Sequence, residues 1–313
     1  MRIGIDIMGG DFAPEAAVLG AILAHKELAP ENSIVLIGNQ QQITDLLKRE
    51  KVPEDTFEVV PSTDVIEMGE HPAKAFSRKP NSSIAIGYRM LAEGTIDGLA
   101  SAGSTGAMMV GAMYTVKAIP GIIRPALTTA IPKPDGSFSI ILDIGINPDC
   151  KPDVLYQYGT LGALYAKHIY QIEDPGVALL NIGSEEEKGN LVVKSAHELM
   201  KGSTDFNFIG NIEANELFDA GSADVIVCDG FVGNIVLKQA EAFYKLYKSR
   251  DMQDAYFDKL NFERYGGSPI LGVNKNIVIG HGISNATAIK GMIKHTFHVA
   301  EVNLSNKIKE AIQ

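Results

Sequence analysis

The sequence predicts an α/β protein with a mostly parallel sheet and flanking helices. Short apolar segments of strand length recur along the chain, and amphipathic segments of helix length lie between many of them. Glycine-rich turns follow several of the strand-like segments. This alternation is typical of parallel strands joined through helices, and ligands of such sheets bind beside the carboxyl ends of the strands. We therefore expect the glycine turns to lie at the functional edge.

The expected strands are short apolar runs, at 3–7, 34–37, 57–60, 98–101, 128–131, 140–142, 177–181, 206–209, 225–228 and 277–279. The expected helices have apolar residues at helical spacing, at 14–28, 41–50, 83–93, 108–117, 191–200, 235–247 and 286–309. No internal repeat or low-complexity linker marks a boundary. We expect one α/β catalytic unit over residues 1–313, with two intertwined subdomains as the alternative.

The composition is ordinary for a soluble globular enzyme: 313 residues, of which 45% are hydrophobic and 21% charged. The net charge of −10 argues against nucleic acid as the main partner, because a phosphate backbone needs a basic surface. Cys150 and Cys228 form no C-x-x-C pair, so neither a disulfide nor a metal site is expected. No signal-like start and no run of about 18 apolar residues occurs. We expect a cytoplasmic protein that is neither exported nor membrane-spanning.

The turn after the strand at 98–101 is a candidate anion site. It contains Ser101, Gly103, Ser104, Thr105 and Gly106, and Ser104 stands where a helix N-cap belongs. Unpaired N–H groups and the dipole of a helix N-terminus favour an anion, and the glycines allow the main chain to approach it. Phosphate is the ligand that this pattern favours. The alternative is that the small residues serve only close packing of the helix on the sheet.

The turn after the strand at 177–181 includes Asn181 and, further on, Ser184, Glu187 and Lys188. Ser184 and Glu187 have the spacing of a capping box, which would begin a helix. That interpretation does not account for Lys188, which could reach over a bound anion as a point charge.

The turn at 228–234 carries Asp229, Gly233 and Asn234 between an apolar strand and a helix. Asp229 could orient Lys188 or handle a proton, and Asn234 could donate to a phosphate or carbonyl oxygen. A plain Asx turn is the alternative for Asp229.

Other candidates are weaker taken singly. Asp11 follows Gly9 and Gly10 and is either a helix cap or a catalytic carboxylate. His281, between two glycines, is either a general acid or base or a packed residue. Arg78 and Lys79, followed by hydroxyl residues, suit a phosphorylated or acidic partner or form a solvated loop.

Eight motifs taken in order resemble the bacterial phosphate acyltransferase family, which makes acyl phosphate from acyl-acyl carrier protein for phospholipid synthesis. They lie at 8–11, 101–107, 124–127, 142–145, 181–183, 210–213, 229–234 and 265–267, and so span nearly the whole chain. The resemblance implies a homodimer whose sheet is like that of isocitrate and isopropylmalate dehydrogenases and is shared with phosphotransacetylases. It also implies that no metal or nucleotide cofactor is needed.

Four features depart from the family pattern. Phe12 stands where the family has His, Ser104 replaces an Asn in the glycine loop, and Ile146 replaces an Ala. The stretch between Tyr247 and Tyr265 is shorter than the family's, which places an apolar, membrane-touching helical hairpin there. Contact with the inner face of the cell membrane is therefore an open question.

The main hypothesis is transfer of a fatty acyl group from acyl carrier protein to phosphate. Residues 101–106 and Lys188 hold phosphate, Asn234 stabilises the oxyanion, and Asp229 orients Lys188 or moves a proton. Asn181, Gly233 and His281 complete the substrate-binding set. Arg78, Lys79 and Arg89 are the expected docking residues for the acidic carrier protein, with a second basic group at Lys245, Lys248 and Arg250. A membrane glycerol-3-phosphate acyltransferase is the expected partner downstream.

Three alternatives remain. A phosphotransacetylase that uses coenzyme A is permitted by the same fold. A metal-dependent decarboxylating dehydrogenase is disfavoured, because no i, i+4 pair of aspartates faces a cluster of arginines. A non-enzymatic anion-binding scaffold of lipid synthesis would bind phosphate without turnover.

Overall fold

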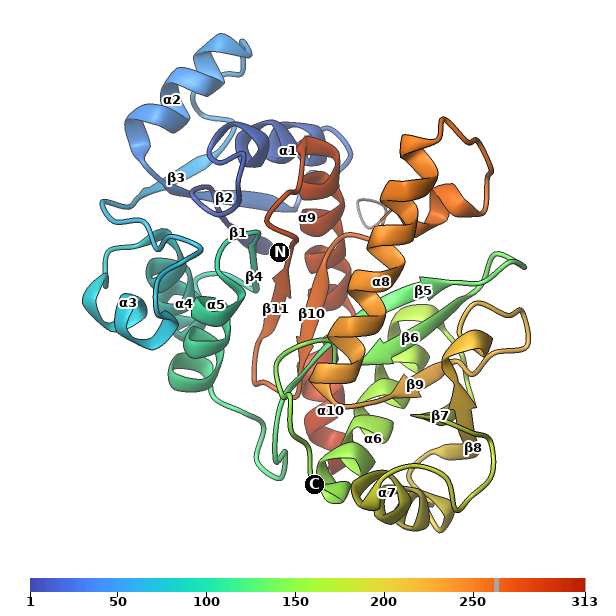
Figure 1. The fold of residues 1–313 in the computed structure, drawn as a ribbon. Helices are drawn as coiled ribbons and strands as arrows, with labels where there is room; N and C mark the ends of the chain where they lie inside the picture. The colour runs from blue at the N-terminus through green and yellow to red at the C-terminus, as the bar shows by residue number, and fades with distance from the viewer. Residues whose placement is uncertain (262–264, 313) are drawn as a thin grey trace. The chain divides into compact units, whose positions relative to one another are not determined.

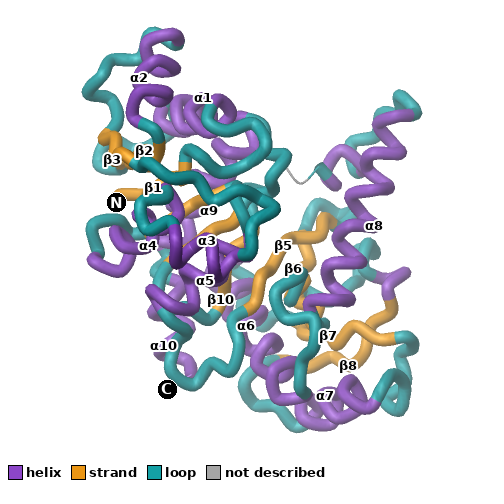
Figure 2. The backbone as a smooth tube through the Cα atoms, turned by 60° about the vertical axis from the view of Figure 1, so that its left-hand side comes forward, coloured by secondary structure: helices purple, strands orange, loops and turns teal. Residues whose placement is uncertain are grey.

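The computed structural model describes residues 1–261 and 265–312 and divides the chain into two compact units (Figure 1). Unit 1 comprises Met1–Ile119 and Glu263–Ser305, and unit 2 comprises Pro120–Phe262 and Asn306–Gln313. Each unit has its own strands with helices packed beside them (Figure 2). The α/β class expected from the sequence is confirmed.

Unit 1 is built on strands β1 (Arg2–Asp6), β2 (Ser33–Gly38), β3 (Glu58–Pro61), β4 (Gly98–Ser101), β10 (Ser268–Leu271) and β11 (Asn276–Ile279). Their order in the sheet is β3-β2-β1-β4-β11-β10. Neighbours are parallel except β10 and β11, which are antiparallel. The helices of this unit are α1 (Glu15–His25), α2 (Gln40–Arg49), α3 (Pro72–Arg78), α4 (Ser83–Glu93), α5 (Thr105–Gly111), the π-helix η1 (Ala112–Val116) and α9 (Ala286–Glu301).

The core of unit 1 forms around β1, whose residues after Arg2 are all buried. Ile3 and Ile5 are fully buried in a cluster that also takes side chains from α1 and α9. These two helices approach closely at Gly20, where a Cβ would overlap the Ile289 side chain. The sheet buried on both faces is what a parallel α/β arrangement requires.

Unit 2 is built on strands β5 (Ala126–Pro132), β6 (Phe138–Leu142), β7 (Gly176–Asn181), β8 (Asn207–Glu213) and β9 (Val225–Val227). Their order is β5-β6-β9-β7-β8, and neighbours are parallel except β5 and β6. The helices are α6 (Pro152–Tyr170), α7 (Leu191–Lys201), α8 (Gly230–Ser249) and the short 3-10 turns η2 (Ala214–Glu216) and η3 (Phe257–Leu260). The last helix, α10 (Leu304–Ile312), begins in unit 1 and ends in unit 2.

Several element boundaries differ from those expected. The helix expected at 235–247 begins at Gly230, because Asp229 caps it. The helix expected at 286–309 is two helices, since Asn303 between them has a φ of +54°. The helical run at 108–117 begins as α5 and becomes a π-helix at Ala112. Helix α6 was not expected, because its buried residues lie on more than one face and two glycines interrupt the apolar pattern.

Candidate active site

Three turns of unit 1 meet at one edge of its sheet. They follow β1, β4 and β11, which are parallel neighbours, so their carboxyl ends coincide. The Asp11 N–H donates to the carbonyl of Gly282 at 2.7 Å, and the Gly280 N–H donates to the carbonyl of Ser101 at 2.8 Å. Turns from three distant parts of the sequence therefore form one surface.

The turn after β4 presents its main chain at this edge. Ser104 is the N-cap of α5, and its hydroxyl accepts from the N–H of Ala107 at 3.3 Å. Thr105 is exposed, and Gly106 packs on Pro72, where a Cβ would overlap the proline ring. The N-cap prediction is confirmed, and for Gly106 the close-packing interpretation also holds.

The Ser101 side chain points into unit 1. Its hydroxyl is fully buried, donates to the Asp6 carboxylate at 2.7 Å and accepts from the N–H of Gly103 at 3.0 Å. The Ser101 hydroxyl is thus engaged inside the unit, and the place of Ser101 in the phosphate-binding set stays a prediction. The hydroxyl holds the loop in place through its hydrogen bonds on the interior side.

Asp6, at the end of β1, was missed by sequence reasoning. It is 1% exposed, and the N–H of Met8 donates to its carboxylate at 3.0 Å. Burial raises the pKa of the Asp6 carboxyl, while hydrogen bonds from the Ser83 and Ser101 hydroxyls oppose that shift. A polar residue that closes an apolar strand is the one signal that could have revealed it.

His281 lies half-buried in the turn after β11. Its Nδ1 accepts from the N–H of Ile283 at 3.4 Å. The next residue, Gly282, bonds Asp11 as described. His281 is thus at the same edge as the turn after β4, as its predicted role requires.

In unit 2 the turns after β6 and β9 interlock. The Cys228 N–H donates to the Leu142 carbonyl at 2.8 Å, and the Asp143 N–H donates to the Cys228 carbonyl at 3.0 Å. The Asp143 carboxylate is buried, which raises its pKa, and N–H groups of Asn147, Leu127 and Ile146 oppose that shift. Sequence reasoning included Asp143 in a family motif without a role.

The start of α8 carries three of the predicted residues. Asp229 is its N-cap and accepts from the N–H of Val232 at 2.8 Å, so the Asx interpretation is confirmed. Gly233 is buried against the Asp143 carbonyl, and the exposed Asn234 lies beside Gly145. The Asn234 amide is therefore available at the carboxyl edge of this sheet.

The turn after β7 holds Asn181 and Lys188 together, because the Asn181 amide donates to the Lys188 carbonyl at 3.2 Å. The exposed Lys188 ammonium lies 4.0 Å from the Glu185 carboxylate. Among the described residues no hydrogen bond or ion pair joins Lys188 to Asp229, and the orientation of Lys188 by Asp229 stays a prediction. The expected capping box at 184–187 is wrong, since α7 begins at Leu191 with Asn190 as its cap.

The predicted carrier-docking residues are not equivalent. Arg78 and Arg89 are exposed on α3 and α4. The Lys79 ammonium pairs with Glu70 and donates to the Val65 carbonyl at 2.6 Å, which closes its own loop. Lys79 therefore also holds its own loop, and the docking role of all three residues stays a prediction.

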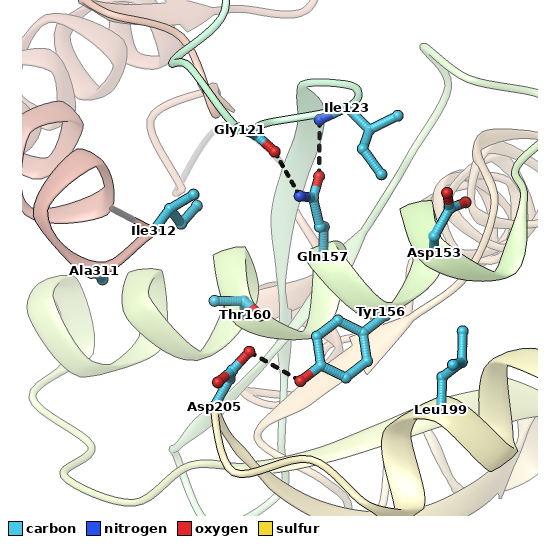
Figure 3. Close-up of a pocket in the computed structure, with 10 residues that line it drawn as sticks. All are labelled: Gly121, Ile123, Asp153, Tyr156, Gln157, Thr160, Leu199, Asp205, Ala311 and Ile312. Carbon is cyan, nitrogen blue, oxygen red and sulfur yellow. Dashed lines mark hydrogen bonds between the residues drawn. The ribbon is translucent and has the colours of Figure 1, made fainter.

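Unit 2 also contains an open pocket of about 570 Å³ between α6, α7 and α10 (Figure 3). The Gln157 amide spans it, accepting from the Ile123 N–H at 2.8 Å and donating to the Gly121 carbonyl at 2.7 Å. The Tyr156 hydroxyl points at Asp205, at 2.9 Å. None of the predicted site residues lines this pocket. In residues 1–261 and 265–312 no cluster of His, Cys, Asp or Glu is suited to a metal ion.

The model of the family "Fatty acid synthesis protein" matches residues 1–254. Two phosphate acyltransferases are similar to this chain over its whole length. That of Dictyoglomus thermophilum is 41% identical to the chain and that of Salinibacter ruber is 40% identical, and each alignment covers 100% of this chain and 98% of the relative.

Two solved structures show the same fold at low identity. A phosphotransacetylase from Streptococcus pyogenes has a TM-score of 0.71 at 20% identity, and the EutD phosphotransacetylase from Staphylococcus aureus has 0.65 at 18%. Each match covers 97% of this chain and 94% of the other. By its full-length similarity to curated relatives and its match to the family model, the chain belongs to the phosphate acyltransferase family and is an acyltransferase of fatty acid synthesis.

Proposed function

We propose that the protein transfers a fatty acyl group from the thioester of acyl carrier protein to inorganic phosphate. A phosphate oxygen attacks the thioester carbonyl, the C–S bond breaks, and acyl phosphate and the carrier thiolate result. The observation that carries the proposal is the identity of about 40% with phosphate acyltransferases over the full chain. The glycine turns at the carboxyl edges of both sheets supply anion-binding groups of the required kind.

Phosphate is held in this proposal by the main chain of residues 103–106 and by Lys188. Phosphate at neutral pH is partly a dianion and a thiol of pKa about 8.5 leaves readily, so little acid-base help is needed. Positioning and charge stabilisation then dominate the rate. Asn181, Gly233 and His281 complete the substrate-binding set in this proposal.

The oxyanion of the tetrahedral intermediate is stabilised by the Asn234 amide. Its place on the first turns of a capped helix fixes the amide at the carboxyl edge. Loss of one such donor typically costs on the order of 100 to 1,000-fold in kcat. Asp229 positions this helix end as its N-cap and is the group proposed to move a proton to the leaving group.

The decisive experiment measures phosphate-dependent release of the carrier thiol from palmitoyl-acyl carrier protein. Lys188→Ala should raise the KM for phosphate, and Asn234→Ala should lower kcat by the factor above. Lys194→Ala and Gln239→Ala are matched controls, since both side chains are exposed on α7 and α8 of the same unit. A folded wild-type protein that binds phosphate without turnover would instead support a non-catalytic scaffold.

A phosphotransacetylase that uses coenzyme A is the second candidate, because the solved structures with this fold carry that name. Palmitoyl-acyl carrier protein and palmitoyl-coenzyme A are compared as donors at equal concentration. A higher kcat/KM with coenzyme A would reassign the donor and leave the acyl acceptor unchanged. The proposed kinship of the sheet to isocitrate and isopropylmalate dehydrogenases does not bear on this choice.

Docking of the acidic carrier protein is assigned to Arg78 and Arg89. Their exposed guanidinium groups can steer an acidic partner although the chain as a whole has a charge of −10. The double reversal Arg78→Glu, Arg89→Glu should slow association and flatten its salt dependence. An unchanged salt slope would move the docking surface to Lys245, Lys248 and Arg250.

A homodimer formed through α8 is the proposed assembly. Phe231, Ile235, Phe243 and Leu246 are all more than half exposed on this 20-residue helix and share one face. Burial of that face in a second copy removes it from water. Phe243 and Leu246 therefore do not face the core of their own unit.

Contact with the membrane surface is proposed to be peripheral. Within the described part of the chain no helix is long and apolar enough to cross a bilayer. The relatives align over 331 positions against 313 here, so they carry residues that this chain lacks. Of the stretch between Tyr247 and Tyr265, residues 262–264 lie outside the described residues. Liposome flotation tests the contact with the membrane surface.

A glycerol-3-phosphate acyltransferase is the proposed downstream partner, because it would consume the acyl phosphate.

A further inference from the structure

We infer that Asp143 is a positioning residue for this reaction: its carboxylate binds the turn after β6, and that turn sets the place of Asn234. The inference rests on the role proposed above for Asn234. It concerns unit 2 alone, and it gives a function to the most heavily hydrogen-bonded buried carboxylate at the carboxyl edge of its sheet.

The Asp143 carboxylate accepts several hydrogen bonds from its own turn. The Asn147 N–H donates at 2.6 Å, its side-chain amide at 3.1 Å, and the Ile146 N–H at 3.2 Å. Two further bonds come from the N–H groups of Gly145, at 3.3 Å, and of Leu127 in β5, at 3.1 Å. No ammonium or guanidinium group forms an ion pair with Asp143 among the described side chains. The carboxylate therefore serves as an acceptor of N–H groups and not as one half of a salt bridge.

The turn held in this way carries the start of α8. The Gly230 N–H donates to the Asn147 carbonyl at 2.8 Å. A Cβ at Gly230 would lie 2.7 Å from the Asp143 carboxylate, and one at Gly233 would overlap the Asp143 carbonyl oxygen. The helix thus rests directly on Asp143, and its first turns follow any displacement of that residue.

Gly145 completes the connection to Asn234. A Cβ on Gly145 would lie 3.6 Å from the Asn234 side-chain oxygen, so the turn forms a wall beside the amide. The φ of +142° at Gly145 is a conformation in which a side chain is strained. Asp143 bonds the N–H of this same residue. Replacing the carboxylate by an amide would place an NH₂ group opposite these N–H donors. The turn beside the Asn234 amide would then lose the hydrogen bonds that hold it.

The test is a double-mutant cycle on the full-length protein, with phosphate-dependent release of the carrier thiol as the readout. Asp143→Asn should lower kcat by about 10 to 100-fold with the KM for phosphate changed by less than about threefold, since only oxyanion stabilisation is weakened. If Asp143 acts through Asn234, the double variant should be no more than about threefold slower than Asn234→Ala alone. A purely structural role predicts that the two losses multiply.

Asp224→Asn is the matched control for loss of a structural carboxylate. Asp224 precedes β9, at the end of that strand opposite Asp229, and accepts from the Gly176 N–H at 3.0 Å and the Lys133 ammonium at 3.5 Å. Its replacement should lower the midpoint of urea unfolding and leave kcat within about threefold of the wild type. An equal loss of kcat in Asp224→Asn would overturn the inference, because general destabilisation would then explain both variants.

Asn147→Ala takes the place of Asp143→Asn in the double-mutant cycle if the Asp143→Asn protein does not fold. It keeps the carboxylate but removes a donor to it, together with a bond to the Pro125 carbonyl at 2.8 Å. The expected loss in kcat is smaller, about 3 to 10-fold, and again absent in the Asn234→Ala background. Multiplying losses would overturn the inference. A wild-type protein without turnover would instead refute the proposed function.

Discussion

At the scale of the residue, Gly233 shows how a contact with a residue distant in sequence limits the side chain that a position can hold. Its Cα faces the Asp143 carbonyl so closely that no side chain fits. Gly233→Ala should lower the free energy of unfolding by about 1 to 3 kcal/mol and shift the start of α8. Urea unfolding measures the first effect. Gly221→Ala, where nothing lies within 4 Å of the added Cβ, should change stability by less than about 0.5 kcal/mol.

The two cysteines, also at the residue scale, are expected to be inert. Burial raises the pKa of Cys150 to about 11 and that of the fully buried Cys228 well above its usual range. The native protein should therefore react slowly with an aromatic disulfide reagent at pH 7.5, and the released carrier thiol can be followed without background. A fast, stoichiometric reaction of the protein alone would contradict this. The denatured chain should titrate two thiols.

At the scale of the element, Glu27, which follows the C-cap of α1, joins the end of that helix to α9 in unit 1. Its carboxylate accepts from the Lys294 ammonium at 2.7 Å and the Lys290 ammonium at 2.9 Å, and hydrogen bonds from these lysines lower its pKa from 4.5 to about 2. A depressed carboxyl pKa contributes stability above pH 4.5 that is lost as the pH falls toward 2.

Glu27→Gln should therefore flatten the decline of stability between pH 4.5 and 2. Because the group is exposed, added salt should diminish the difference between variant and wild type. Thermal unfolding at several pH values, at low and high salt, measures both effects. If the stability of the two proteins declined equally as the pH falls, the contact would contribute nothing to stability.

At the scale of the whole molecule, the exposed apolar face of α8 is the feature that a monomer does not explain. Phe243 and Leu246 are each 55% exposed. The double variant Phe243→Glu, Leu246→Glu should be monomeric in sedimentation equilibrium if the wild type dimerises there. Arg250→Glu, on the same helix end, is the control for charge alone. A wild-type monomer that floats with anionic liposomes would assign this face to the membrane.

Local patterns predicted local structure well. The alternation of strands and helices and the cap at Ser104 depend on residues close in sequence, and both were found. The same logic failed at Ser184 and Glu187, because Asn190 supplies a competing cap nearer to the apolar run of α7. Where two local signals compete, the packing of the helix on its sheet decides.

The sequence by itself determined the α/β class, the family and the glycine turns that carry the candidate site, since each depends on short, ordered motifs. Only the tertiary structure decided that Ser101 turns inward to Asp6, that Lys79 closes its own loop on Glu70, and that Asp143 supports α8. Those contacts join residues 9 to 95 positions apart. Burial of a polar group creates a demand for a partner that no local pattern reveals.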